Sequence, residues 1–200
     1  MKPSIIFSVC LLFFATLQAQ DAQMAARFNF HTPESWRGEV IKLPPRFAPD
    51  LEWHGIESIK FAPGMFKPGS ESFFSYVLVF LLSKDDDVSE KALHDQILTY
   101  YRGLAKAVMG GRGIPVDTGN FQLDLKADPV EDNKKYLSTW TATLDWIEPF
   151  ATQKAQNLHI EVHQWKNADQ PVLYFTVSPQ AKDHAIWKEM RQYREQFEIK

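Results

Sequence analysis

Alternation of apolar and polar positions along the chain predicts seven β-strands. In most of these segments apolar side chains recur at every second position, as in a half-buried strand. The segment 72–83 is instead apolar almost throughout, which is typical of a central strand covered on both faces. The predicted strands are 38–43, 55–62, 72–83, 121–127, 135–147, 157–165 and 171–178. Because the connections between the later strands are short, an antiparallel meander is expected.

Two segments have the apolar spacing of helices. The first follows a capping box, DVSE at 87–90, and ends at Gly110 and Gly111. Its apolar positions fall on one face and predict a helix over 89–108. In the second segment, 183–197, apolar residues recur at intervals of four, three and four. This spacing predicts an amphipathic C-terminal helix.

The order of these elements predicts an α+β fold. It consists of an antiparallel sheet of about six to seven strands, with a central helix and a C-terminal helix packed on its apolar face. Stretches with proline and glycine, such as 43–50 and 61–72, are short and rich in aromatic residues, so they are interpreted as packed loops. No linker divides the chain, and residues 20–200 are expected to form a single domain.

The N-terminus has the pattern of a signal peptide. Lys2 precedes a nearly unbroken apolar run, 5–17, and small and polar residues follow it. The run is shorter than the roughly 20 residues that span a bilayer. We therefore expect residues 1–19 to be a signal peptide that is cleaved after Ala19, and the protein to be secreted or periplasmic. A retained membrane anchor is the alternative.

Composition narrows the chemistry of the exported chain. Cys10 is the only cysteine and lies within the predicted signal peptide, so disulfides, thiol catalysis and thiolate metal sites are excluded from the mature protein. Without Lys2 the chain has 21 basic and 25 acidic residues, a net charge of −4. No basic stripe is present, so nucleic acid is not an expected partner. No second apolar segment is long enough for a membrane span.

Candidate chemistry is concentrated in the predicted strand 157–165, NLHIEVHQW. By alternation His159, Glu161, His163 and Trp165 share one face and apolar residues share the other. Asp145 lies on the corresponding polar face of strand 135–147. If neighbouring strands pair in register, these residues form one patch. The patch is either a sheet surface that faces water or an acid/base site of a hydrolase or lyase, built from His159, Glu161, His163 and Asp145.

Strand geometry argues against a metal site here. Residues four apart on a strand have Cα atoms about 13 Å apart, whereas zinc–nitrogen bonds are about 2.1 Å long. His159 and His163 therefore cannot bind the same ion from a straight strand. Glu161 with one histidine would need a third ligand from a neighbouring strand, such as Asp145 or Asp124. We predict no metal and no cofactor.

A second candidate feature is the loop FAPGMF at 61–66. Phe61, Met65 and Phe66 are interpreted either as a packed turn or as the apolar lip of a groove. Gly64 is expected to supply a positive φ angle. An exposed apolar patch at this loop would also suit a component of a larger assembly.

Two resemblances accompany these patterns. The segments SWRGEVIKLPPRFAP and GIESIKFAPGMF resemble those of an uncharacterised family of secreted bacterial proteins, which implies export but no activity. The segment FNFHTPESW and the closing helix resemble the layout of Mog1/PsbP-like domains. That layout implies an antiparallel sheet with helices packed against it and a role in binding or assisting other proteins.

The predicted function is that of an exported, non-catalytic binding or accessory protein of the bacterial envelope. Its partner would be an unknown protein or small molecule. This prediction follows from the lack of a G-x-S-x-G nucleophile motif, a thiol or a phosphate loop before a helix. The hydrolase or lyase on the polar sheet face is the alternative.

Overall fold

The predicted strands form one antiparallel sheet in the computed structural model, which describes residues 24–130 and 135–200. The predicted signal peptide, 1–19, lies outside the described residues. The strands are β2 (Arg37–Leu43), β3 (Gly55–Phe61), β4 (Tyr76–Leu82), β5 (Gln122–Asp128), β6 (Ser138–Ile147), β7 (Ala155–Asn167) and β8 (Gln170–Ser178). Their order in the sheet is β2-β3-β4-β8-β7-β6-β5, so two meanders join where β4 pairs with β8. The predicted fold class is confirmed.

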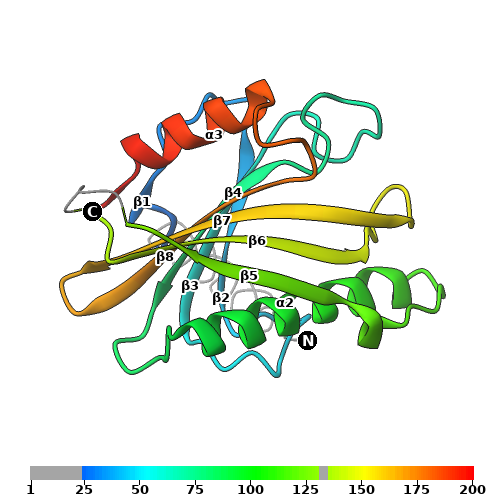
Figure 1. Ribbon diagram of the computed structural model, residues 1–200, viewed down its shortest axis with the longest axis horizontal. Helices are drawn as coiled ribbons and strands as arrows, with labels where there is room; N and C mark the ends of the chain where they lie inside the picture. Colours follow the sequence, from blue (N-terminus) through cyan, green and yellow to red (C-terminus); the bar gives the residue numbers. More distant parts are fainter. Residues whose placement is uncertain (1–23, 131–134) are drawn as a thin grey trace, which may run out of the picture.

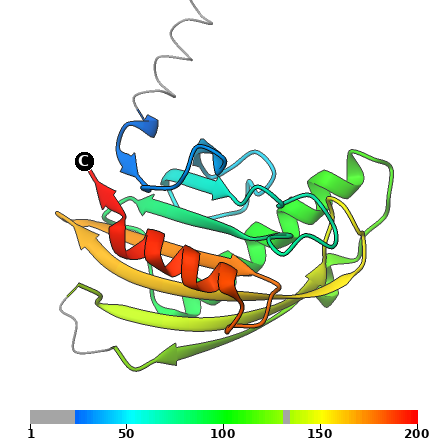
Figure 2. The same cartoon turned by 90° about the horizontal axis from the view of Figure 1, so that it is seen from above.

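The two helices cover opposite faces of this sheet (Figures 1 and 2). α2 (Glu90–Gly110) packs on the face that carries Leu78 and Phe80, whereas α3 (Ala185–Gln196) packs on the face that carries Val77 and Val79. The prediction that both helices pack on one apolar face was wrong in this detail. Because β4 is apolar on both faces, it offers a packing surface to each helix.

The boundaries of α2 lie within two residues of the predicted helix, 89–108. Ser89 is the N-cap, and its hydroxyl accepts a hydrogen bond from the Ala92 N–H at 3.3 Å. The helix ends at the glycine pair, with Gly111 as the C-cap. The N-terminal end therefore follows capping chemistry that is readable in the sequence. At the other end Gly111 keeps a right-handed φ of −61°, and the positive φ angle there occurs at Gly113.

Replacing Ser89 by Ala is expected to destabilise the protein by about 1 kcal/mol, because one helical N–H loses its acceptor. Urea unfolding at neutral pH measures this loss. Ser89→Asp is the matched control, since a carboxylate also caps a helix and should retain most of the stability. Equal losses in the two variants would contradict the capping role.

The structure departs from the sequence analysis at short elements. β1 (Phe28–Asn29) pairs with β9 (Glu198–Ile199), and η1 (Thr118–Asn120) is a single 3₁₀ turn. Elements this short show no periodicity that a sequence reading can detect. The first residues of the predicted strand 72–83 form a turn, because Phe74 has a positive φ of 48° that an extended chain does not adopt.

No helix within 24–130 and 135–200 is both long and apolar enough to cross a membrane.

Candidate functional site

The polar residues predicted on β5, β6 and β7 lie side by side across these three strands. Thr141 stands opposite both Lys126 and Glu161, and Thr139 stands opposite His163. The strands are thus direct neighbours, and their polar side chains share a face. This face is not entirely open to water, because α3 lies over part of it (Figure 1).

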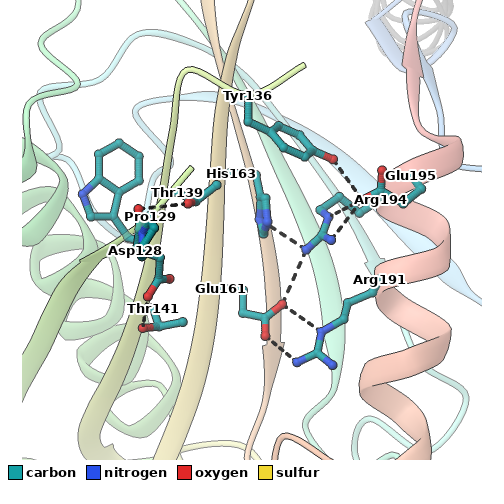
Figure 3. Close-up of a pocket in the computed structure, with 11 residues that line it drawn as sticks. Asp128, Pro129, Tyr136, Thr139, Thr141, Glu161, His163, Arg191, Arg194 and Glu195 are labelled. Carbon is teal, nitrogen blue, oxygen red and sulfur yellow. Dashed lines mark hydrogen bonds and ion pairs between the residues drawn. The ribbon is translucent and has the colours of Figure 1, made fainter. Parts of the chain in front are cut away.

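A pocket of about 440 Å³ lies between this polar face and α3. We call it the polar-face pocket. Glu161 and His163 line it from β7, and Arg191 and Arg194 line it from α3. Figure 3 shows both arginines reaching from the helix toward the two β7 side chains. Of the residues predicted for a catalytic site, only Glu161 and His163 meet here.

Glu161 is held by three cations. Its Oε1 accepts hydrogen bonds from Arg191 Nη2 at 2.6 Å and from Lys182 Nζ at 3.2 Å, and Arg194 Nη1 lies 3.5 Å from its Oε2. Burial raises the pKa of this carboxyl, but the hydrogen bond from Arg191 and the charge of Lys182 outweigh burial, and the net pKa is lowered. Glu161 is therefore ionised at neutral pH, and its ion pairs tie α3 to the sheet.

Of the two β7 histidines, His163 is uncharged at neutral pH. Burial and the nearby Arg194 lower the pKa of His163 to about 3, with Arg194 Nη1 at 3.4 Å from its Nδ1. Burial and Lys182 also lower the pKa of His159, whose Nδ1 lies 3.3 Å from Thr143 Oγ1. A general acid or base works best with a pKa near the operating pH. His163 does not meet that condition, and the lowered pKa of Glu161 lies on the acid side of neutral pH as well.

The remaining predicted residues of this face are elsewhere. Asp145 is exposed and stands opposite Asn157. It is six residues along β6 from Thr139, the residue opposite His163, and this separation corresponds to roughly 20 Å along the strand. His159 does not line the polar-face pocket. Trp165 is half-buried against Tyr174 and Phe197 beside the end of α3. The structure therefore does not bring the predicted catalytic set together.

In the part of the chain that the structure describes, no cluster of three or more histidine, cysteine or acidic side chains is arranged to hold a metal ion.

A second pocket lies on the other face of the sheet, between α2 and strands β2, β3 and β4. Its volume is about 510 Å³, and we call it the apolar pocket. It is lined by all three residues that were predicted to form either a packed turn or an apolar lip: Phe61, Met65 and Phe66. Met65 is buried, Phe61 is half-buried and Phe66 is 52% exposed. The loop thus packs at Met65 and presents Phe66 at the rim.

Phe150 forms the facing part of the rim and is held in place by its own turn. Its ring centroid lies 5.5 Å from that of Phe66 and 5.9 Å from that of Phe74. The Glu148 carboxylate accepts hydrogen bonds from the N–H groups of residues 150–152, and Arg112 donates to the Phe150 carbonyl at 2.7 Å. The rim is therefore preorganised by hydrogen bonds behind it.

Gly64 serves this loop differently from the prediction. It does not have a positive φ, so that expectation was wrong; positive φ angles occur further along the chain, at Gly69 and Phe74. A Cβ atom at Gly64 would lie 2.0 Å from Ser70 Oγ and 2.4 Å from Ser72 Oγ. Glycine is needed here because the serine side chains fold back against the backbone, where Ser72 Oγ accepts a hydrogen bond from the Gly64 N–H.

A carboxyl group lies at the floor of the apolar pocket. Glu57 is 1% exposed, and its Oε1 accepts a hydrogen bond from the Tyr100 hydroxyl at 2.8 Å. Its Oε2 is buried and has no hydrogen-bond partner among the described residues. Burial raises the pKa of Glu57 to about 8, with the Tyr100 hydrogen bond opposing the rise and the charge of Glu39 adding to it. Glu57 is therefore mostly protonated at neutral pH.

The sequence analysis missed Glu57, although its position was readable. Glu57 has the same parity as Ile59 and Phe61 on β3, so an acidic residue falls on the face that the strand buries. In the sheet it stands opposite Ile41 on one side and Phe80 on the other. A carboxyl group at an apolar parity position is the signal that would have identified it.

Comparisons with known proteins add little to this geometry. No protein-family model matches the chain, and no curated protein matches it in sequence. Its fold is similar to the Ran-binding protein Mog1p of Saccharomyces cerevisiae, with 12% identity, 82% of this chain and 96% of that chain covered, and a TM-score of 0.36. It is also similar to LpqN of Mycobacterium tuberculosis, involved in cell envelope biogenesis, with 12% identity, coverage of 86% and 82%, and a TM-score of 0.31. At TM-scores this low, neither likeness carries an argument about function.

Proposed function

We propose that this chain is an exported, non-catalytic binding protein whose small-molecule ligand occupies the apolar pocket. The observation that carries the proposal is the combination of an aromatic rim with a buried, incompletely paired carboxyl group at the floor. A mainly apolar cavity with a few polar groups is the usual form of a ligand site, and a volume of about 510 Å³ falls in the usual range.

Burial of the Glu57 carboxyl group destabilises the folded chain, so a functional role is expected for it. An acidic side chain in an apolar core is rare, and an oxygen without a hydrogen-bond partner adds a desolvation penalty of about 1–3 kcal/mol. A ligand that bonds to Oε2 would remove this penalty. The exposed Phe66 at the rim is consistent with this role, because a ligand would cover part of its surface.

The predicted signal peptide supports export. A lone apolar run after a lysine, followed by small and polar residues, is typical of secretion, and a mature chain free of cysteine tolerates an oxidising compartment. The hydrolase or lyase alternative has less support. Glu161 is occupied by ion pairs, and the low pKa of His163 removes the proton that a neutral-pH acid would need.

Binding of an uncharged apolar fluorophore, N-phenyl-1-naphthylamine, tests the proposal. We expect saturable fluorescence enhancement with the folded chain. Leu104 lines the pocket from α2, so Leu104→Trp should fill it and weaken binding at least roughly tenfold, since the new side chain competes for the same volume.

Ala107→Trp is the matched control, because it places the same side chain at an exposed position of the same helix. It should bind the fluorophore as the unmodified chain does. Equal binding by both variants would show that the fluorophore lies elsewhere, and no binding to the unmodified chain would remove the proposal.

A further inference from the structure

We infer that the ligand of the apolar pocket is an amphipathic organic cation, with an apolar body against the aromatic rim and an ammonium group on Glu57. This inference rests on the proposed function and names its ligand class. It follows from three features of the pocket: the sign of its charges, the abundance of aromatic rings and the unpartnered carboxyl oxygen.

All charged side chains that line the apolar pocket are acidic. They are Glu57 at the floor and Glu39 on β2, and no lysine, arginine or histidine of the described residues lines it. In the β2–β3 pair Glu39 stands opposite Ile59, and Ile41 stands opposite Glu57. The two carboxyl groups are therefore diagonal neighbours on one face of the sheet. A carboxylate ligand would be repelled by Glu39, and by Glu57 once it ionises, with no counter-ion nearby, whereas a cation would be attracted by both groups.

The aromatic lining favours a cation as well. Seven of the lining side chains are phenylalanine or tyrosine. The face of an aromatic ring attracts a cation by about 0.5–2 kcal/mol, most strongly where water is excluded. The rings also provide an apolar wall for an alkyl or aryl body. A simple inorganic cation would not use this apolar surface.

Glu57 supplies the specific contact. Its Oε1 is already bonded to Tyr100, and the other titratable groups packed around the floor are the hydroxyls of Tyr76 and Tyr101, which bond to each other, and Glu39. Oε2 is therefore the acceptor that remains. An ammonium N–H placed on it would form a charge-assisted hydrogen bond and would provide the counter-ion that an ionised Glu57 lacks.

The binding of a cation is then linked to the loss of a proton. Glu57 has a pKa of about 8, so it is mostly protonated at pH 7 and mostly ionised at pH 9. Because the cation binds the ionised form, its affinity should rise roughly tenfold from pH 7 to pH 9. An uncharged ligand of the same shape should show no such rise.

Isothermal titration calorimetry with octylamine, octan-1-ol and octanoate tests the inference on the full-length mature chain. These probes share one apolar body and differ only in the head group. Octylamine should bind most tightly, with the tenfold rise in affinity given above. At pH 7 its apparent enthalpy should differ between phosphate and Tris buffers by the amount that corresponds to release of roughly 0.9 proton.

Glu57→Gln should abolish the pH dependence and bring the affinity for octylamine to that for octan-1-ol. Glu34→Gln is the control, since it makes the same charge change at an exposed position outside the pocket. Thermal melts verify that both variants are folded.

The outcomes separate this inference from the proposed function. Octan-1-ol binding as tightly as octylamine at both pH values, or octanoate binding most tightly, would overturn the cationic ligand and leave the pocket as a binding site. Binding of N-phenyl-1-naphthylamine without displacement by octylamine would also overturn it. If neither the fluorophore nor any of the three probes binds, the proposed function fails too.

Discussion

The variant Glu57→Gln is expected to be more stable than the unmodified chain at pH 9, by on the order of 5 kcal/mol. A change of pKa from 4.5 to about 8 means that ionising Glu57 in the folded protein costs this much more than ionising it in the unfolded chain. Glutamine does not ionise, and its amide oxygen can still accept the Tyr100 hydrogen bond. The variant therefore avoids the cost.

The pH dependence follows from the same pKa values. In the unmodified chain the contribution of protonated Glu57 is fully present below pH 4.5, declines as the pH rises, and is lost above about pH 8. The stability difference between the two proteins should thus be near zero at pH 4.5 and largest at pH 9. Urea unfolding at pH 4.5, 7 and 9 measures it.

Glu34→Gln controls for the change in net charge, because Glu34 is exposed. This control should follow the unmodified chain at all three pH values. A constant difference between Glu57→Gln and the unmodified chain would show that Glu57 is not protonated in the folded protein.

The second large effect is expected on the opposite face, where Glu161→Gln should destabilise the protein by about 2–3 kcal/mol at pH 7. The variant leaves Lys182, Arg191 and Arg194 without their shared counter-ion. Breaking a buried ion pair on one side costs about 3–5 kcal/mol. The expected loss is smaller because the side chains of Arg191 and Lys182 are each 36% exposed, so that water screens their charges.

Its pH dependence has the opposite sign to that of Glu57. The pKa of Glu161 is lowered from 4.5, so its contribution is present above this value and is lost as the pH falls through the lowered pKa. The difference between Glu161→Gln and the unmodified chain should shrink in acid. Urea unfolding at pH 7 and pH 3 measures this change.

Asp124→Asn is a suitable control for Glu161→Gln on the same face of the sheet. Asp124 pairs with Lys126 at 2.6 Å, but their side chains are 64% and 71% exposed. An exposed pair contributes at most about 1 kcal/mol, so this variant should change stability little. A loss as large as that of Glu161→Gln would contradict the distinction between a buried and an exposed carboxylate.

Much of the fold could be predicted from the sequence because strand alternation and helix capping are local signals. The period of two predicted β5, β6 and β7 as neighbouring amphipathic strands, and the capping box and the glycine pair predicted where α2 begins and ends. The position of α3 could not be predicted in this way. Its apolar stripe shows that it docks, but the face on which it docks depends on the pairing of β4 with β8, which joins distant parts of the chain.

The candidate site was harder to predict for a related reason. The alternation of His159, Glu161 and His163 predicted a candidate acid/base site, yet the chemistry of His163 depends on Arg194, which belongs to the separate element α3. In contrast, the loop that contains Phe61 and Phe66 was recognised from composition alone. Glu57 could be predicted only in part. The sequence shows that it shares the apolar face of β3, but its burial depends on α2 lying over this strand.

The joint between β4 and β8 also has a consequence for folding. It pairs Tyr76 with Val177, residues that are far apart in the sequence, whereas each meander is built from local hairpins. Local pairings form faster than distant ones, so the two halves of the sheet are expected to form before they meet. Until then β4 is an edge strand whose second side is unpaired, and all seven of its side chains are apolar or aromatic. Such an edge pairs readily with other chains, and refolding yield should therefore fall as the protein concentration is raised.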